Sequence, residues 1–598
     1  MSGTGPCAPM DVLLHRSCRQ VPRRALPKLA AGLLLAAVLL PLGSIALGQV
    51  HDANPSNLAE KVALLQPGDT LRLAAGTYDQ GIYLKNLNGS ESQRTIVTGP
   101  EDRLQVALMR GRVTQTPVEG LGISSANVLL ENCSYVTVRN LSLDGWDGRS
   151  LAVSSPPTYV RGVSTAYSLD TPCHHVTLEE LTIINYGANQ SSSGISTKAP
   201  AWDWVMRRNL ILGAGTGVYL GDSDGTKPFV KGTFENNIVV NTVGYNLQVK
   251  RQNLGTRDLE GMPTEAVTTI RNNVFSKILA PENYSEISWG SRPNILLNPF
   301  PDTGNGSGDS YNVYGNFFYQ NYESIEALFQ GTGNISLHNN VFINELGSRQ
   351  AVWFQSHHGY NKKIRVFFNT IIAKGRGLKL KDIDSDHIGD QYVFGNAIFA
   401  SPALDLASGV QAFSNFTGAY ADAPTHMVNP LGPLGSLDVY PRTGHLRGAA
   451  ADTSSVAGVT HWDRDFNGVQ RDATYRGAHC GEGQNAGWLP VRDFKPTSGG
   501  LGLPEMPANR APKITTAPTA SPQPASAGGE ITFQVGVEDP DGDQMTVLWH
   551  FGDGVIGSGT TARHAYWQDA DTPVANGTYT VKVLVRDRLG ASAQATLQ

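Results

Sequence analysis

The stretch SYNVYGNFFYQNYESIEALFQGTGNISLHNNVFI, residues 310–343, decides the fold. It holds three short apolar segments, GNFFY (315–319), ALFQ (327–330) and NNVFI (339–343), separated by residues rich in Gly, Asn and Ser. Aromatic and β-branched segments of this length are typical of strands, and no helical periodicity joins them. The stretch therefore predicts short strands in close succession.

The first and third of these segments share a pattern that recurs along the chain, a polar residue, an Asn, and then apolar residues. The segments are RNLSL, EELTI, RNLIL, NNIVV, NNVFS, GNFFY, NNVFI, FNTII and GNAIF, with marker residues Asn140, Glu180, Asn209, Asn237, Asn273, Asn316, Asn340, Asn369 and Asn396. The markers lie 24 to 43 residues apart, most of them fewer than 30. A short period with occasional insertions indicates a solenoid.

A second strand follows each marker, as in GISTK, GVYLG, YNLQVK, EISWG, ALFQ, AVWFQ and GLKLK. Such spacing predicts an all-β, right-handed parallel β-helix over residues 49–492. Coils stacked about 4.8 Å apart would align the Asn side chains in a hydrogen-bonded ladder, so we assign these residues a structural role.

Two cysteines test this register. Cys133 and Cys173 each lie seven residues before a marker, so we expect them in contact on adjacent coils. Whether they form a disulfide stays open, because a buried Cys also packs as a small apolar residue.

The two ends of the chain differ from the repeats. Residues 1–48 combine five Lys and Arg, the apolar run Leu29–Leu40 and small residues at Ala46 and Gly48, which predicts a cleaved signal peptide and a secreted or cell-surface, extracellular or periplasmic protein. An uncleaved membrane anchor is the alternative, although the apolar run is short for a bilayer span. After cleavage we expect no stable membrane insertion.

Charge and composition limit the partners. The chain of 598 residues has a net charge of −5, and without residues 1–48 it has 42 Lys and Arg against 51 Asp and Glu, a net charge of −9. This balance disfavours a nucleic-acid partner. Any cationic site must be local.

Residues 493–529 are rich in Gly, Pro, Ala, Ser and Thr, which predicts a linker. The segments VEDPDGDQMTVLWHFGDG (537–554), HAY (564–566) and NGTYTVKVLVRDRLG (576–590) resemble a PKD (polycystic kidney disease) domain, an Ig-like sandwich expected over 530–598 with Trp549 in its core. Asp539, Asp541 and Asp543 are expected to form a turn rather than a calcium loop.

The second strands locate the candidate site. Alternation predicts inward pairs at Ile195/Thr197, Val218/Leu220, Leu247/Val249, Ile287/Trp289, Val352/Phe354 and Leu378/Leu380. The intervening, outward residues are Ser196/Lys198, Tyr219/Gly221, Gln248/Lys250, Ser288/Gly290, Trp353/Gln355 and Lys379/Lys381. Aromatic rings beside cations suit a long acidic sugar chain, although exposed Lys residues also keep a sheet soluble.

LLQPGDTLRLAAGTYDQGIYL (64–84) resembles the opening rung of the polysaccharide lyases that include chondroitinase B and alginate lyase, and WDRDFNGVQRDATYRGAHCG (462–481) is similar to a closing segment of secreted β-helix proteins. The resemblance implies a Lys base, an Arg nearby as acid and a calcium ion. Lys250 matches the base and Arg292 suits the Arg role better than Arg251, which should point to the opposite side of its strand. Asp222 and Asp224 are the candidate calcium ligands, and either is also a partner for Lys250.

The sequence thus predicts a protein, most simply a monomer, that cleaves an acidic polysaccharide by β-elimination. The candidate substrate-binding residues are Lys198, Tyr219, Gln248, Trp353, Gln355, Lys379 and Lys381. A non-catalytic glycan-binding or matrix protein is the alternative. A hydrolase of the polygalacturonase type would need paired carboxylates and its own motifs, of which only SHHG (356–359) has a distant counterpart here.

Overall fold

A computed structural model describes residues 48–102, 104–115, 124–146, 159–187, 190–278, 292–322, 326–496, 510–543, 545–568, 572–587 and 591–598. The predicted signal peptide, apart from Gly48, lies outside these residues. No helix in the described part of the chain has the length and apolar character needed to cross a bilayer.

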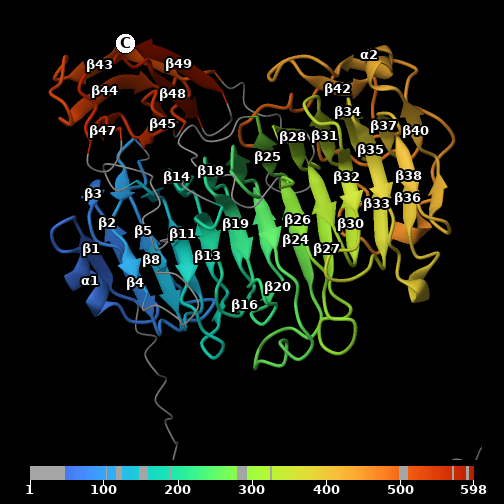
Figure 1. The fold of residues 1–598 in the computed structure, drawn as a ribbon, viewed down its shortest axis with the longest axis horizontal. Coiled ribbons are helices and arrows are strands. Elements are labelled where there is room, and N and C mark those ends of the chain that lie inside the picture. The colour runs from blue at the N-terminus through green and yellow to red at the C-terminus, as the bar shows by residue number, and fades with distance from the viewer. Residues whose placement is uncertain are drawn as a thin grey trace, which may run out of the picture. The chain divides into compact units, whose positions relative to one another are not determined.

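Most of the described chain winds through three parallel sheets, and each coil adds one strand to each sheet (Figure 1). The predicted parallel β-helix is therefore confirmed. The first sheet contains, in order, β1 (Val50–Ala53), β2 (Thr70–Leu73), β5 (Thr95–Thr98), β9 (Val136–Arg139), β13 (Thr177–Glu179), β17 (Val205–Arg207), β21 (Thr233–Glu235), β24 (Val267–Arg271), β27 (Ser310–Tyr314), β30 (Ile335–His338), β33 (Ile364–Phe367), β36 (Tyr392–Phe394) and β39 (Gln411–Phe413).

In most coils the strand of the second sheet follows that of the first after a turn of two residues. It contains β3 (Gly76–Tyr78), β6 (Ala107–Met109), β10 (Ser142–Asp144), β14 (Thr182–Ile184), β18 (Leu210–Leu212), β22 (Ile238–Val240), β25 (Val274–Lys277), β28 (Phe317–Asn321), β31 (Val341–Asn344), β34 (Thr370–Ala373), β37 (Ala397–Phe399) and β40 (Phe416–Gly418).

The third sheet carries the candidate site. It contains β4 (Ile82–Lys85), β8 (Ser124–Glu131), β11 (Tyr159–Thr165), β15 (Ser193–Ser196), β19 (Thr216–Leu220), β23 (Leu247–Val249), β26 (Ile295–Leu297), β29 (Phe329–Gly331), β32 (Gln350–Phe354), β35 (Arg376–Leu380) and β38 (Leu404–Leu406), with β7 (Val113–Thr114) antiparallel to β8.

The remaining elements are short. A small parallel sheet joins β12 (Cys173–His174), β16 (Ala201–Trp202) and β20 (Phe229–Val230), and a hairpin joins β41 (Met427–Asn429) and β42 (Asp438–Pro441). The helices are α1 (Leu58–Leu64), α2 (Ala423–His426) and the 3-10 turns η1 (Ser385–His387), η2 (Tyr420–Asp422) and η3 (Ser454–Val456).

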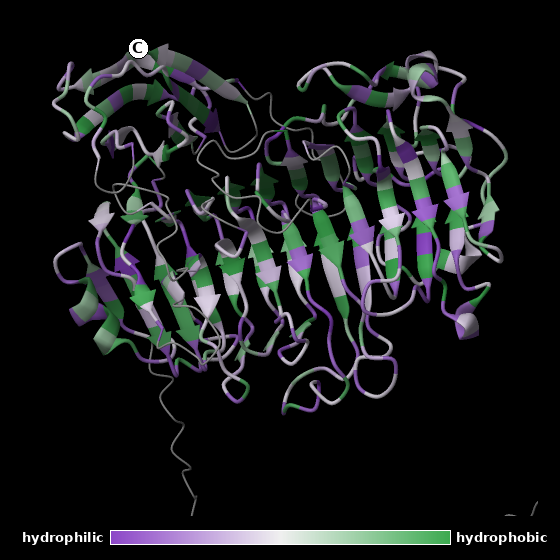
Figure 2. Ribbon diagram, viewed as in Figure 1, coloured by the Kyte–Doolittle hydropathy of each residue, from purple (hydrophilic) through white to green (hydrophobic). Residues whose placement is uncertain are grey.

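Alternation along the strands builds the core of the β-helix, as the hydropathy colouring shows (Figure 2). On the third sheet the inward column runs through Val163, Ile195, Val218, Leu247, Ile295, Phe329, Val352, Leu378 and Leu404. On the second sheet, Phe275, Phe318 and Phe342 stack with ring centroids 5.2 and 4.4 Å apart. Like side chains at equivalent positions thus hold successive coils in register.

The predicted inward pairs agree with this register except on one coil. There the third-sheet strand is β26, whose Ile295 pairs with Leu247. The predicted positions Ile287, Ser288, Trp289 and Gly290 lie outside the described residues. The insertion after β25 made EISWG the nearest apolar segment to its marker, and ILL (295–297) was overlooked.

The Asn ladder is confirmed and extends one coil further than predicted. The backbone N–H and Nδ2 of Asn316 both donate to Asn340 Oδ1, at 2.9 and 3.0 Å, and Asn316 Oδ1 accepts the equivalent pair from Asn273. The same bonds join Asn209, Asn237, Asn273, Asn316, Asn340, Asn369, Asn396 and Asn415.

Two predicted markers belong to a different column. Asn140 and Glu180 have φ of 56° and 58° and align with Arg208, which precedes Asn209 and has φ of 55°. Each turn therefore contains a left-handed residue followed by a ladder residue, and the ladder position of these two early coils is occupied by Leu141 and Leu181. Asn adopts the left-handed conformation readily, which is why the same letter occurs in both columns.

Replacing Asn316 with alanine is expected to lower the free energy of unfolding by about 3 kcal/mol, because the buried donors of Asn273 and the carbonyl of Ile270 lose their partner. Urea unfolding followed by circular dichroism measures this. The exposed Asn429→Ala is the control and should change stability by less than about 0.5 kcal/mol. Equal free energies of unfolding for the two variants would contradict a contribution of the Asn ladder to stability.

The cysteine prediction is confirmed for the register. Ser134 pairs with His174 on the adjacent coil, so Cys133 and Cys173 occupy equivalent positions, and both are buried. Both thiols are free. Burial raises the pKa of the Cys133 and Cys173 thiols, so they act as small apolar side chains.

The C-terminal segment forms an antiparallel sandwich. One sheet contains β43 (Lys513–Ser521), β44 (Ile531–Glu538) and β47 (Thr561–His564), and the other β46 (Ile556–Ser558), β45 (Met545–His550), β48 (Val581–Asp587) and β49 (Ser592–Leu597). Trp549 is fully buried, as predicted, and its Nε1 donates to the carbonyl of Gly559.

Two features of the sandwich refine the sequence interpretation. Strand β43 lies inside the segment for which a linker was predicted, because its mostly exposed Thr, Ala and Ser residues lack an apolar alternation. The carboxylates of Asp539, Asp541 and Asp543 lie within 4.8 Å of one another. Asp539 Oδ1 accepts the backbone N–H groups of Asp541 and Asp543, the pattern of an Asp-stabilised turn.

Candidate functional site

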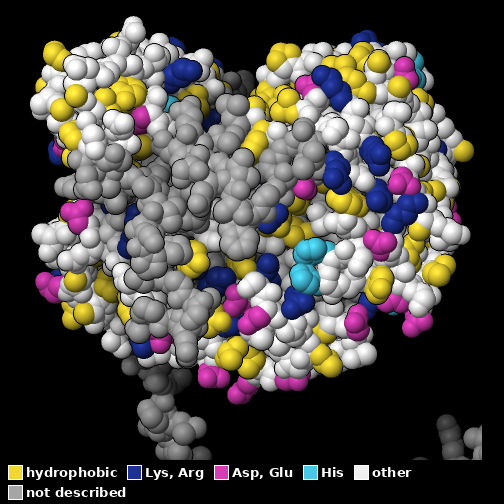
Figure 3. Space-filling model, in the orientation of Figure 1, with side chains coloured by type: hydrophobic (Ala, Val, Ile, Leu, Met, Phe, Trp, Pro, Cys, Tyr) yellow, Lys and Arg dark blue, Asp and Glu magenta, His cyan; other side chains and the backbone are white. Residues whose placement is uncertain are grey.

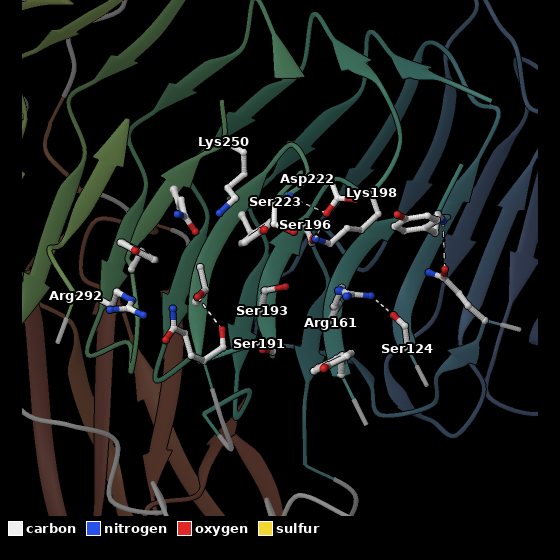
Figure 4. A pocket seen from close by; sticks show the side chains of 18 residues that line it. Ser124, Arg161, Ser191, Ser193, Ser196, Lys198, Asp222, Ser223, Lys250 and Arg292 are labelled. Atoms are coloured by element: carbon white, nitrogen blue, oxygen red, sulfur yellow. Dashed lines mark hydrogen bonds and ion pairs between the residues drawn. The ribbon is translucent and has the colours of Figure 1, made fainter. Parts of the chain in front are cut away.

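A cavity of about 440 Å³ lies on the outer face of the third sheet. Side chains from six successive strands or their ends, β8 to β26, contribute to it (Figure 4). The lining residues include Ser124, Tyr159, Arg161, Tyr167, Gln190, Ser193, Ser196, Lys198, Tyr219, Asp222, Tyr245, Gln248, Lys250 and Arg292. Four cations and four tyrosines thus share a cavity whose lining contains one carboxylate among the described residues.

The outward column predicted from the sequence forms the floor of this cavity. Ser196 pairs with Tyr219, and Tyr219 with Gln248, so the three side chains lie side by side on adjacent strands. Lys198 and Lys250 lie two residues beyond Ser196 and Gln248 and therefore also point outward. The Nζ atoms of Lys198 and Lys250 lie 3.9 and 5.1 Å from the centre of the Tyr219 ring.

Gly221 separates the two lysines in their column. Its φ is +87°, and a Cβ placed there would lie 3.1 Å from Lys250 Cβ. A side chain at this position would therefore both strain the backbone and displace Lys250. The glycine leaves bare backbone between the two ammonium groups.

Lys250 is the lysine best suited to act as a base. Burial lowers its pKa, and Arg251 and Arg292 lower it further, whereas Asp222 opposes them. No carboxylate of the described residues lies within ion-pair distance of its Nζ atom. The neutral amine form of Lys250 is therefore more populated at a given pH than that of an exposed lysine.

Lys198 differs because it is paired. Its Nζ lies 3.2 Å from Asp222 Oδ1, and Lys227 Nζ lies 2.9 Å from the other oxygen of the same carboxylate. Burial lowers the pKa of Lys198 to about 8, while Asp222 opposes the shift. Burial raises the pKa of Asp222, but Lys198 and Lys227 outweigh it and bring the value to about 2.

These contacts leave little room for a calcium ion. The Asp222 carboxylate is occupied by two ammonium groups and by the backbone N–H of Ser223 at 2.9 Å. The Asp224 side chain is exposed and accepts from the backbone and hydroxyl of Thr226. Two lysines beside one ligand would repel a divalent cation, so the predicted pair does not fit calcium.

Arg251 and Arg292 lie in different places, as the strand geometry predicts. Arg292 lines the cavity, and its guanidinium carbon lies 5.8 Å from the centre of the Tyr245 ring. Arg251 is not among the lining residues. Its side chain contacts His358 Nδ1 at 3.0 Å and reaches the carbonyl of Asp224.

The more distant predicted residues belong to a neighbouring cavity or to none. A second cavity of about 250 Å³ shares Tyr245 and Arg292 with the first and is also lined by Trp353, Gln355 and His357. His357 Nδ1 lies 2.6 Å from Asn298 Oδ1, and burial together with His358, Lys250 and the nearby arginines lowers the pKa of His357 to about 4.

Lys379 and Lys381 line neither cavity. Lys379 Nζ lies 5.3 Å from the Trp353 ring centre, so it supports that ring. Lys381 Nζ bonds Asp405 Oδ1 and the carbonyl of Leu406, both at 2.8 Å. The predicted outward residues are therefore aligned, but Lys381 at the end of the column forms an ion pair with Asp405, and Lys379 contacts the Trp353 ring.

Three important lining residues were not predicted. Arg161 lies two residues before the inward Val163, and Tyr245 lies two residues before the inward Leu247, so strict alternation would place both side chains inward. Tyr245 begins the predicted second strand YNLQVK, whereas none of the predicted second strands contains Arg161. Tyr167 lies after β11, and Lys227 Nζ lies 4.0 Å from its ring centre, a contact for which the sequence carries no signal.

Charge on the described surface is mixed. Lys and Arg side chains are interspersed with Asp and Glu on the face drawn in Figure 3. No single basic patch dominates the described part of that face.

Comparison with known proteins identifies the C-terminal sandwich. Residues 509–598 match the family model described as PKD domain. No curated protein matches the chain.

Solved structures resemble the β-helix at low identity. A GH136 lacto-N-biosidase from Eubacterium ramulus is 12% identical over 62% of this chain and 68% of that chain, with a TM-score of 0.42. An alginate lyase from Paenibacillus sp. str. FPU-7 is 13% identical over 62% and 99%, with a TM-score of 0.28. Pectate lyase Pel9A is 9% identical over 73% and 90%, with a TM-score of 0.32. Likenesses this distant do not bear on activity.

Proposed function

We propose that this protein binds an acidic polysaccharide in the cavity on the third sheet and cleaves it by β-elimination next to a uronate. One observation carries the proposal. Lys250, with a lowered pKa and no carboxylate partner among the described residues, faces a tyrosine ring in a cavity where cations outnumber carboxylates four to one.

The lining suits a charged sugar chain. Tyrosine rings offer flat apolar faces to sugar rings, and the Ser and Gln side chains offer hydrogen bonds to hydroxyl groups. Arg292 and the lysines offer charge-assisted hydrogen bonds to a carboxylate. A neutral polysaccharide would offer no counter-charge to Lys250, which has no carboxylate within ion-pair distance among the described residues.

The same groups can perform the elimination. The proton on the carbon next to the uronate carboxylate becomes acidic when that carboxylate is neutralised, a role that we assign to Arg292 because it lines the cavity. The neutral amine of Lys250 takes this proton, a carbon–carbon double bond forms, and the bond to the leaving oxygen breaks. That oxygen then takes a proton, which Lys198, largely protonated at neutral pH with a pKa of about 8, is able to give.

Hydrolysis is less well supported by this cavity. A glycoside hydrolase places two carboxyl groups on either side of the scissile bond, one of them protonated. The described lining has only Asp222, whose lowered pKa and two lysine partners keep it ionised. Asp222 is therefore suited to holding the lysines and poorly suited to acting as an acid.

A product screen tests the proposal. The purified protein is incubated with alginate, pectate and glycosaminoglycans, with added calcium or with a chelator, and unsaturated uronates are followed by ultraviolet absorbance. We expect product from at least one uronate-containing polymer. Binding without product from any of them would instead support the non-catalytic glycan-binding alternative.

The pH dependence should report the lysine. Because Lys250 acts as the neutral amine, kcat/KM is expected to rise with pH on a limb whose midpoint lies below the ordinary lysine pKa of about 10.4. It should fall again at higher pH as Lys198, the proposed proton donor with a pKa of about 8, loses its proton. Arg292→Gln removes a cation that lowers this pKa, so it should move the midpoint to higher pH as well as lower the rate. A profile of kcat/KM against pH for both proteins measures the shift.

An unchanged midpoint in Arg292→Gln would show that the titrating group lies elsewhere. Lys363→Gln, far from Lys250 in sequence and outside the two cavities described above, is the matched loss of one positive charge and should leave the profile unchanged. Secretion through residues 1–48 and a monomeric state complete the proposal. Sequencing the mature N-terminus and light scattering would test these two points.

A further inference from the structure

Arg161 is a buried cation with an unusual lack of partners. It lies on β11 with 8% of its surface exposed, and its guanidinium donates to the hydroxyl of Ser124. Among the described residues, no carboxylate lies within ion-pair distance of it. Burial lowers the pKa of Arg161 to about 10, as expected for a charge without a close counter-charge.

Two other buried arginines show how this chain treats a structural guanidinium. Arg257 is paired with the buried carboxylate of Asp309 and also bonds Gln252 and the carbonyl of Pro263. Arg471 donates to three backbone carbonyls and to Asn339. Burial of a guanidinium is therefore normally compensated here, and Arg161 is not compensated in the same way.

The neighbours of Arg161 also lack partners. Ser193 pairs with Arg161 on the adjacent strand, and Ser196 lies at the other end of the same strand. The hydroxyls of Ser193 and Ser196 are buried and have no hydrogen-bond partner, although these residues are only 2% and 1% exposed. All three side chains line the cavity (Figure 4). Arg161 and Ser193, at paired positions of adjacent strands, offer a cation and a hydroxyl donor to one anionic group, whereas Ser196 lies three residues, about 10 Å, further along its strand.

This receptor is separate from the proposed catalytic end. Strands β11, β15, β19, β23 and β26 are consecutive in the third sheet, so Arg161 and Arg292 lie four strand steps apart, about 19 Å along the stack. Tyr219 lies between them on the middle strand. One monosaccharide does not span that distance, so the two positions would contact different units of a chain.

We infer that Arg161 and Ser193 form a second anion-binding position, and that the substrate is a polyanionic chain with a carboxylate or sulfate on a unit other than the one that is cleaved. This inference rests on the proposed function for the position of the cleaved unit. It adds the requirement that one bound chain carries at least two negative charges.

Binding calorimetry on the Lys250→Ala protein, which should not cleave its ligand, tests the inference. The ligands are a tetrauronate, the same tetramer with a single carboxylate left after reduction of the others, and that singly charged tetramer with one sulfate ester on a distant unit. We expect the tetrauronate to bind at least about tenfold more tightly than the singly charged tetramer. The sulfated tetramer shows whether sulfate replaces the second carboxylate.

Arg161→Gln in the same background should reduce this preference to about twofold or less. Arg376→Gln, an exposed arginine on β35 of the same sheet, is the matched control and should keep the preference. If Arg161→Gln fails to fold, Ser193→Ala is measured instead and should reduce the preference severalfold.

The outcomes separate the inference from the proposed function. An undiminished preference in Arg161→Gln, or equal affinities in the parent protein, would overturn the second anion position even if the product screen detects elimination. An Arg161-dependent preference without product from any polymer would overturn the elimination and leave polyanion binding standing.

Discussion

Lys250→Ala is expected to lower kcat/KM for the uronate polymer by about 10²- to 10⁴-fold, the usual contribution of a general base. Affinity for the same polymer should fall only a few-fold, because Arg161, Lys198 and Arg292 still line the cavity. Initial rates of unsaturated product and calorimetric binding on the same preparation separate the two effects.

Two further variants make this result specific. Lys250→Arg keeps the positive charge but cannot act as a base near neutral pH, so it should be as inactive as the alanine variant. Lys379→Ala removes a lysine from the same sheet face outside both cavities and should keep at least half of the activity. Full activity in Lys250→Arg would exclude Lys250 as the base.

Asp222→Asn should be the most destabilising single change in the cavity. It leaves the ammonium group of Lys227, which is 1% exposed, without its carboxylate. Breaking a buried ion pair by removing one partner costs about 3–5 kcal/mol. Urea unfolding measures the loss, and Asp224→Asn, in the same loop but exposed, should cost less than about 0.5 kcal/mol.

The double variant Asp222→Asn with Lys227→Met distinguishes an unpaired charge from lost packing. It should recover part of the stability, because the buried charge is removed with its partner. The depressed pKa of Asp222, about 2, also predicts that this pair's contribution is complete above the carboxylate's ordinary pKa and is lost as pH falls toward 2. No recovery in the double variant would show that the carboxylate acts mainly through its hydrogen bond to Ser223.

The fold was predictable from the sequence because each coil repeats one local pattern. Alternation identified Ile195, Val218 and Leu247 as inward residues and Tyr219 as an outward one, and the pairing of these strands confirms it. Matching residue types failed where the backbone conformation differs. Asn140 is the same residue type as Asn209, but it occupies the left-handed position that precedes the ladder position in its coil. Insertions also hid β26 behind a nearer apolar segment.

The site was only partly predictable. Lys198 and Lys250 were predictable because they continue the outward alternation of their strands, whereas Arg161 was not, because alternation from the inward Val163 would place it in the core. The ion-pair partners of Asp222 could not be predicted from the sequence either. Lys198 precedes Asp222 by one coil and Lys227 follows it in the loop, and only the folded turn brings both ammonium groups to one carboxylate.

The coil at which the Asn ladder begins affects which coils of the β-helix unfold locally most easily. Asn209 is its first member and accepts from the backbone of Leu181, whereas the preceding coils have leucine in its place. Strands β11 and β15 thus belong to coils that lack the Asn ladder, and β19, β23 and β26 belong to coils that have it. On heating, the coils that carry Arg161 and Lys198 should therefore unfold locally before the coil that carries Lys250. The half of the cavity with Arg161 and Lys198 would be more mobile than the half with Lys250.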